Sequence, residues 1–255
     1  GHERSRFLNF LLRWEKLDAL HICLDVLIPC HPTHVSLRDL RAKAFLTQGR
    51  AEKALRVMEE RLQRRKSLPA RALLGRIHQS RGCIARARET ARAMTEESDD
   101  SVMAWALRGQ IELAAGDTQA AKEAYSRVRA LRPNGRAYLR GMLAICQIEG
   151  DLVAASGYAV RLLGTARDGH PLSIGDVRSL RDYFRASGET TRLVEMEVEL
   201  ERRYREELNE IRDHISPAGE PYSFSKTERA EVGSMAHSAG AGDGPGPGAI
   251  SAPAV

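Results

Sequence analysis

A glycine returns every 33 to 38 residues along this chain, at Gly49, Gly82, Gly116, Gly150 and Gly188. Each glycine lies between two stretches in which apolar residues recur at the spacing of an amphipathic helix. A helix hairpin of this length cannot bury its apolar face alone and must stack on similar neighbours. The period therefore predicts an elongated helical solenoid, whose functional element is a repeated surface rather than a catalytic centre.

Composition supports a helical, globular chain. Apolar residues make up 42% of the 255 residues, charged residues 29% and aromatic residues only 5%, which is few for an antiparallel sheet core. The net charge of +5 is too small to imply nucleic acid by itself. No stretch approaches the roughly 18 to 20 apolar residues of a membrane span.

The clearest unit is "AWALRGQIELAAGDTQAAKEAYSRVRALRPN", residues 104 to 134. It resembles a tetratricopeptide (TPR) repeat, because small, aromatic and turn residues match that family at several spaced positions at once. The matching positions are Trp105 and Gly109 in the first helix, Gly116 and Asp117 in the turn, Ala121 and Tyr125 in the second helix, and Pro133 and Asn134 at the break.

Weaker copies align on the other turn glycines, and the last has Leu193 where alanine is usual. The first hairpin fits with Trp14 in place of the turn glycine. Residues 7 to about 200 are thus expected to hold about six TPR-like hairpins. The weaker copies are residues 37–60, 70–94, 138–163 and 174–200.

In two repeats the sequence allows two helix registers that differ by one residue. Arg41 and Arg108 fall where the family has a core leucine, with Leu40 and Leu107 one place earlier. A small adjustment at the turn brings the leucines inward, and an arginine stem can also lie along apolar surface with its charge in water.

The resemblance implies an all-α, right-handed superhelical solenoid over residues 1–216, ending in a charged helix at residues 191–215. This helix carries an apolar stripe, so it is either a solvating cap or a dimer-forming coiled coil. Residues 217–255 are rich in Gly, Pro, Ser and Ala and are predicted to be a disordered tail. The end hairpins and the apolar stripe also allow a homo-oligomer.

No catalytic motif is present: we find no phosphate loop, dinucleotide fingerprint or nucleophile elbow, and expect neither an enzyme nor a cofactor. One segment, "HICLDVLIPCHPTH", gathers histidines and cysteines, but its irregular spacing does not suit zinc, so no metal is expected. The four cysteines are scattered over three repeats, which indicates buried free thiols in a reducing, cytoplasmic compartment.

Residues 61–92 hold ten cations against the single acid Glu89. Cations that recur every five residues wind around helices, which favours a solvated rim. A surface for an acidic partner and a nucleic-acid site are the alternatives, the second less favoured because interleaved aromatics are missing. The candidate basic patch is Arg61, Arg64, Arg65, Lys66, Arg71 and Arg81.

The resemblance further implies a non-catalytic scaffold that binds a peptide or helix of a partner protein, preferably an acidic one, in a concave groove lined by the first helix of each repeat. A chaperone or assembly factor of a bacterial secretion or envelope system is one alternative, and a nucleic-acid-associated module using the basic patch is another. The predicted groove residues are Lys43, Phe45, Arg76, Trp105, Leu113 and Arg140.

Overall fold

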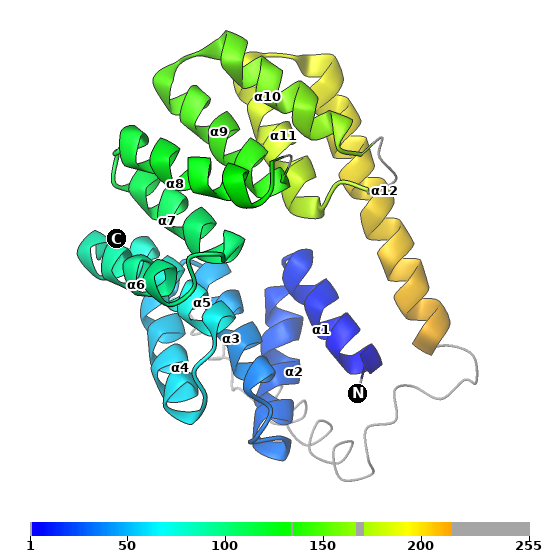
Figure 1. Ribbon diagram of the computed structural model, residues 1–255. Coiled ribbons are helices and arrows are strands. Elements are labelled where there is room, and N and C mark those ends of the chain that lie inside the picture. Colours follow the sequence, from blue (N-terminus) through cyan, green and yellow to red (C-terminus); the bar gives the residue numbers. More distant parts are fainter. Residues whose placement is uncertain (1, 134, 167–170, 216–255) are drawn as a thin grey trace, which may run out of the picture. The chain divides into compact units, whose positions relative to one another are not determined.

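The computed structural model describes residues 2–133, 135–166 and 171–215, and these ranges contain twelve helices and no strand (Figure 1). The helices pair in chain order as six hairpins, which confirms the predicted all-α solenoid for the described part of the chain. In each hairpin the odd-numbered helix is called helix A and the even-numbered helix is called helix B. The helices are α1 (His2–Arg13), α2 (Leu17–Cys30), α3 (Val35–Thr47), α4 (Ala51–Arg64), α5 (Leu68–Ser80), α6 (Ile84–Glu97), α7 (Val102–Ala114), α8 (Thr118–Leu131), α9 (Arg136–Glu149), α10 (Leu152–Gly164), α11 (Ile174–Ser187) and α12 (Thr190–Ile215).

Residues 1–211 group into one compact unit. The tail predicted at residues 217–255 lies outside the described residues.

The periodic glycines are the hairpin turns, as predicted. All five have φ between 72° and 80°, a left-handed conformation in which a side chain is strained. In two hairpins the residue after the glycine caps helix B: the carboxylates of Asp117 and Asp151 accept hydrogen bonds from the backbone N–H of Ala120 and Ala154 at 2.9 Å. A glycine followed by a capping residue therefore ends one helix and starts the next.

The turn of the first hairpin differs from the prediction. Glu15, not Trp14, occupies the left-handed position, with φ of 58°, two residues before α2 as Gly49 is two residues before α4. The Trp14 side chain is committed elsewhere, because its Nε1 donates to Glu207 of α12 at 2.8 Å. The repeat pattern places the turn one residue too early here.

Alanines in the B helices let neighbouring helices approach closely. Ala54, Ala87, Ala121 and Ala155 each lie five residues after a turn glycine, and each is fully buried. Larger apolar side chains from the A helices fill the space between hairpins. In the last hairpin Leu193 holds the alanine position and is only half-buried.

The register of the two ambiguous A helices follows the leucines. Leu40 and Leu107 are buried in the core, whereas Arg41 and Arg108 lie beside it. The Arg41 guanidinium forms an ion pair with Asp25. Burial of an aliphatic side chain outweighs the family pattern because an arginine at the same place would lose its hydration.

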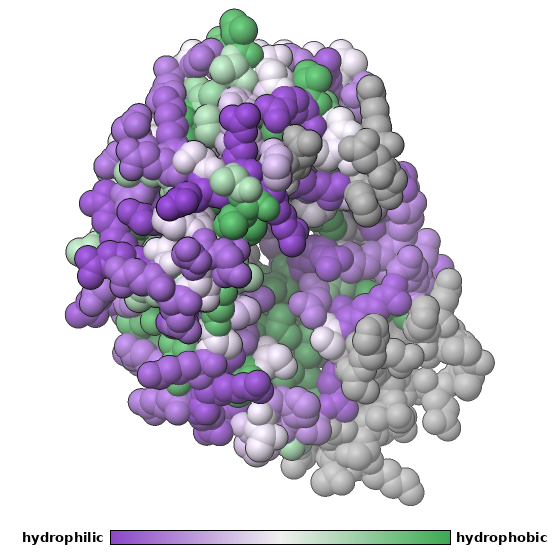
Figure 2. Space-filling model, in the orientation of Figure 1, coloured by the Kyte–Doolittle hydropathy of each residue, from purple (hydrophilic) through white to green (hydrophobic). Residues whose placement is uncertain are grey.

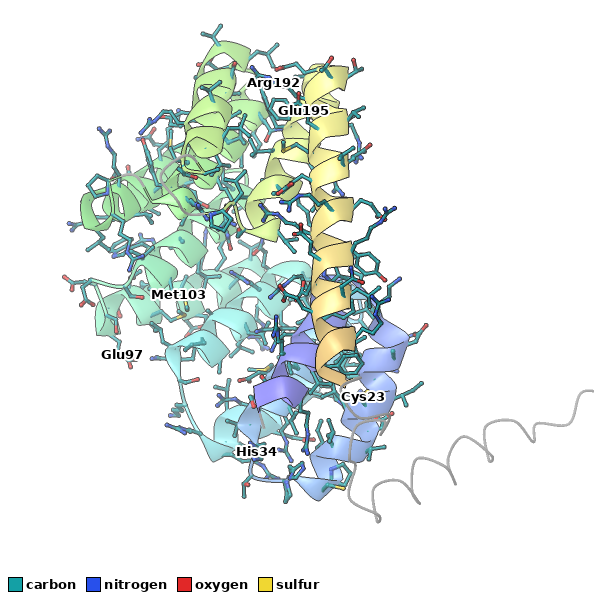
Figure 3. All side chains as sticks on the ribbon, turned by 90° about the vertical axis from the view of Figure 1, so that its right-hand side faces the viewer. Cys23, His34, Glu97, Met103, Arg192 and Glu195 are labelled. Carbon is teal, nitrogen blue, oxygen red and sulfur yellow. The ribbon has the colours of Figure 1, made fainter. Side chains whose placement is uncertain are left out.

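Helix α12 packs its apolar stripe within the chain. Met196 is buried and joins the core of the last hairpins, with Leu193 and Leu200 packed against it. Further along, the Tyr204 ring stacks on Phe10 at 5.8 Å between centroids, and the Glu207 carboxylate pairs with Arg13 at 2.7 Å. In Figure 3, α12 runs from Arg192 and Glu195 down to the blue helices at the start of the chain.

We expect Gly116→Ala and Gly157→Ala to have opposite effects on stability. Alanine at the left-handed turn position costs about 1–2 kcal/mol of strain. Gly157 lies on the exposed face of α10 with nothing within 4 Å of an added Cβ, so alanine there stabilises the helix by up to about 1 kcal/mol. Thermal unfolding followed by circular dichroism measures both shifts, and midpoint shifts of the same sign would contradict this account of the turns.

Candidate functional site: a groove along the A helices

The A helices α5, α7 and α9 present one face to a shared groove of about 1120 Å³. Figure 2 shows a hollow in this side of the molecule, with apolar residues inside it and mostly hydrophilic residues around it. Its residues follow helical spacing along each A helix. The lining comprises Leu46, Arg76, Gln79, Ser80, Gly82, Ile84, Met103, Ala106, Leu107, Gln110, Leu113, Ala114, Tyr125, Ala137, Arg140, Gly141, Ala144, Ile148 and Ser179.

The ring of Tyr125, from α8, lies between α7 and α9 at the floor of the groove. A Cβ added at Gly109 would lie 2.6 Å from the Tyr125 ring, and one added at Gly141 would overlap the ring from the other side. Glycine is therefore required on both A helices for the ring to fit. Burial raises the pKa of the Tyr125 phenol to about 12, against the opposing effect of Arg140 and Arg76. The phenol is neutral at physiological pH.

Arg76 carries the unpaired charge of the groove. Its side chain is exposed to the groove and has no ion pair or hydrogen bond to any described residue. Loss of solvation among the groove walls lowers its pKa, and the positive charge of Arg140 lowers it further. An arginine remains charged under these conditions, so an anion that enters the groove relieves the repulsion between the two guanidinium groups.

Arg140 is held by a buried carboxylate. Its Nη1 lies 3.2 Å from Oδ1 of Asp176, whose side chain is 1% exposed. The other carboxylate oxygen of Asp176 accepts hydrogen bonds from the Ser173 backbone N–H at 2.9 Å and from the Ser173 hydroxyl at 2.7 Å, which caps α11. Arg140 is thus positioned by a carboxylate that also pairs with Arg136, whereas Arg76 has no carboxylate partner among the described residues.

The rest of the described lining is apolar or uncharged. Met103 and Ile148 expose 44% and 58% of their surface, and Gln79 and Gln110 add amide groups to the lining. This lining contains no Asp, Glu, His or Cys. It can hold apolar side chains, hydrogen-bond a peptide backbone and accept a negative charge.

Half of the sequence-predicted groove residues line this groove: Arg76, Leu113 and Arg140. Lys43 is exposed on α3 outside the groove. The ring centroids of Phe45 and His21 lie 4.7 Å apart, and Phe45 packs on the core of the second and third repeats. Trp105 lies in the first turn of α7, where its Nε1 donates to the backbone oxygen of Asp99 at 2.7 Å. Aromatic character alone does not place a side chain in the groove.

Sequence reasoning missed Tyr125 as a floor residue and Gln110 and Ile148 as lining residues. A signal was present, because positions 103, 106, 110 and 113 of α7 share one helix face, and so do positions 137, 140, 144 and 148 of α9. Matching faces on successive A helices identify the groove better than single conspicuous residues do.

The six residues of the candidate basic patch are not brought together on one surface. Arg61 is 3% exposed and forms an ion pair with Asp39 at 2.8 Å, which corrects its assignment to a surface patch. Arg71 pairs with Glu97, and Arg81 pairs with Glu52 at 2.7 Å. Arg64 donates to the backbone oxygen of Pro32 at 3.2 Å, and Arg65 and Lys66 are exposed. Acids outside the segment thus pair with three of the six patch residues.

The expected buried thiols are corrected for three cysteines. Cys146 is buried, and burial raises its pKa, but Cys30 is exposed and Cys23 and Cys83 are partly exposed. Within the described ranges no group of three or more His, Cys, Asp or Glu side chains could hold a metal ion. No helix in the described part of the chain combines the length and apolar character needed to cross a membrane.

Comparison with known proteins finds solved structures that resemble this architecture. A chain of the APC/C hetero-tetramer Cut9–Hcn1 is similar with a TM-score of 0.56 and 13% identity, over 74% of this chain and 37% of that one. PilF of Pseudomonas aeruginosa is similar with a TM-score of 0.49 and 13% identity, over 84% of this chain and 98% of that one. A thermophilic TPR protein of Thermus thermophilus is similar with a TM-score of 0.47 and 13% identity, over 77% of this chain and 95% of that one. No protein-family model and no curated protein matches the sequence.

The described residues thus form a helical-repeat solenoid. More specifically, helix hairpins joined by glycine turns form the arrangement that the resemblance to tetratricopeptide repeats predicts. This chain spans little more than a third of the Cut9–Hcn1 chain that it resembles.

We expect Gly141→Ala to destabilise the protein by about 1–3 kcal/mol, because the added methyl group overlaps the Tyr125 ring and the close-packed helices cannot separate freely. The cost should fall in a Tyr125→Leu background, where the ring is absent. A double-mutant cycle from thermal unfolding measures this coupling. Additive effects of the two substitutions would contradict the proposed contact.

Proposed function

We propose that the protein is a non-catalytic interaction scaffold that binds a peptide or helix of a partner protein in the groove along α5, α7 and α9. The observation that carries this proposal is the lining of the groove: exposed apolar side chains, two glutamine amides and two arginines, with no carboxylate among the described lining residues. This combination suits a segment that brings apolar side chains and at least one acid.

Arg76 is the proposed selector for the acid. It faces the groove without a partner and close enough to Arg140 for mutual repulsion. A hydrogen bond between a charged donor and a charged acceptor contributes about 1.5–3 kcal/mol. Met103 and Leu113 on α7 provide the apolar contacts beside it. Such a scaffold would hold together components of a multiprotein complex, and a chaperone or assembly factor would use the same groove.

The basic patch supports a nucleic-acid role poorly, because Arg61, Arg71 and Arg81 already pair with acids of the same chain. The four free cysteines are compatible with the proposed cytoplasmic location.

The test is a peptide library selected on the full chain, followed by affinity measurements on the selected peptides. We expect peptides with apolar and acidic residues, and a loss of affinity of about tenfold or more with Arg76→Glu, since 1.4 kcal/mol corresponds to a factor of ten. Met103→Ala should weaken binding too, without unfolding the protein, because Met103 is 44% exposed.

Arg56→Glu is the matched control. Arg56 is an exposed arginine of α4 outside the groove, and the same charge reversal there should leave the affinity unchanged. Peptides that bind the Arg76, Met103 and Arg56 variants equally well would show that the groove is not the binding surface. Failure to select any peptide would count against the scaffold itself.

A further inference from the structure

Five arginines near one edge of the fourth and fifth repeats have no carboxylate partner among the described residues. Most other arginines of the chain do, for example Arg88, which pairs with Glu112 at 2.6 Å. Four of the five are exposed and the fifth is partly exposed. They are Arg108, Arg127, Arg129, Arg132 and Arg161.

Four of these guanidinium groups lie over aromatic rings. Arg108 and Arg127 lie 5.4 Å and 5.6 Å from the centre of the Trp105 ring. Arg129 lies 5.9 Å from the Tyr138 ring centre, and Arg161 lies 5.6 Å from that of Tyr158.

The rings are themselves fixed. The Trp105 Nε1 donates to the Asp99 backbone oxygen at 2.7 Å, and the hydroxyls of Tyr138 and Tyr158 lie 3.4 Å apart. These exposed arginines therefore lie next to rings that are held in place.

Chain topology brings these groups to the same edge. Trp105 and Tyr138 lie in the first turns of α7 and α9, whereas Arg129 and Arg161 lie in the last turns of α8 and α10. In antiparallel hairpins the start of helix A is adjacent to the end of helix B. Arg127 and Arg129 leave α8 on either side of the buried Val128, so the end of α8 joins the Trp105 and Tyr138 clusters. We name this set, Arg127, Arg129 and Arg161 with their rings, the arginine edge.

Contact with a ring leaves these arginines able to bind an anion. The ring face attracts the guanidinium charge, and the guanidinium N–H groups, which have no carboxylate partner among the described residues, form the planar fork that matches a carboxylate. The ring also restricts the side chain in advance, so less conformational entropy is lost when an anion binds. The exposed acids near these arginines in the sequence are Asp99 and Asp100 in the loop before α7 and Glu123 on α8, and none of the three forms an ion pair among the described residues.

We propose that the arginine edge binds an acidic segment of a partner protein, at a surface separate from the groove. Carboxylates of Asp and Glu side chains would take the free guanidinium rims of Arg127, Arg129 and Arg161. A protein segment is favoured over single-stranded nucleic acid because the chain's own arginines already occupy faces of the rings on which bases would stack.

The test measures binding of a fluorescein-labelled peptide rich in Asp and Glu, and of a labelled oligothymidine, to the full chain. The triple variant Arg127→Glu, Arg129→Glu, Arg161→Glu should lose at least about tenfold in affinity for the acidic peptide. The triple substitution of the same residues to Lys keeps the charge and removes the planar fork, so it should also weaken binding, though less. Circular dichroism and the unfolding midpoint verify that each variant is folded.

Arg56→Glu is the control outside both surfaces, and the acidic peptide should bind it as it binds the unchanged protein. Arg76→Glu measures any share of the peptide that the groove holds, and it should lose less affinity than the triple Glu variant. A loss with Arg76→Glu and none with the triple variant would assign the peptide to the groove and overturn the proposal. An equal loss with Arg56→Glu would show unspecific attraction and overturn it as well. Tighter binding of the oligothymidine than of the peptide would overturn the choice of a protein partner. Lysine variants that bind as well as the unchanged protein would overturn the role of the stacked guanidinium groups.

Discussion

The contact of Tyr125 with Gly109 and Gly141 sets the spacing of the A helices on which the groove depends. The ring comes from a B helix and reaches between two A helices, and neither helix could carry a Cβ at the contact. Because protein interiors are close-packed, a gap or an overlap at this point would shift α7 against α9 and alter every side chain above it. The same contact therefore forms the floor of the groove and sets how the fourth and fifth repeats stack on each other.

The ends of the chain add a second constraint. Helix α12 continues past the last hairpin and contacts α1 through Tyr204 and Glu207. Arg178 of α11 joins the same region, because its Nη2 donates to the backbone oxygen of Arg13 at 2.7 Å. The first and last hairpins, whose faces would otherwise be exposed in a linear stack of repeats, thus partly cover each other. Packing of α12 on α1 of the same chain differs from both arrangements predicted for this helix, the solvating cap and the coiled-coil dimer.

The features that depend on local chemistry were predicted from the sequence. Turn glycines, the alanines five residues later and the paired apolar faces follow from backbone conformation and helical period, and the glycine and alanine recur together in the second to fifth repeats. Long-range pairing could not be predicted in this way. The ion pair of Arg61 with Asp39 and the hydrogen bond of Trp14 to Glu207 join residues whose sequence separation reveals no relation. Of the predicted groove residues, Arg76 and Arg140 line the groove, whereas Phe45 and Trp105 lie outside it, and the lining residues Tyr125 and Ile148 were not predicted.

Hydrogen–deuterium exchange of the full chain, with and without a peptide selected from a library, tests the central claim that the A-helix face is the partner site. The account predicts slower exchange on binding in α5, α7 and α9, around Arg76, Gln110 and Arg140, with little change in α4, whose Arg56 face lies outside the groove. Protection confined to the B helices, with α5, α7 and α9 unchanged, would contradict it.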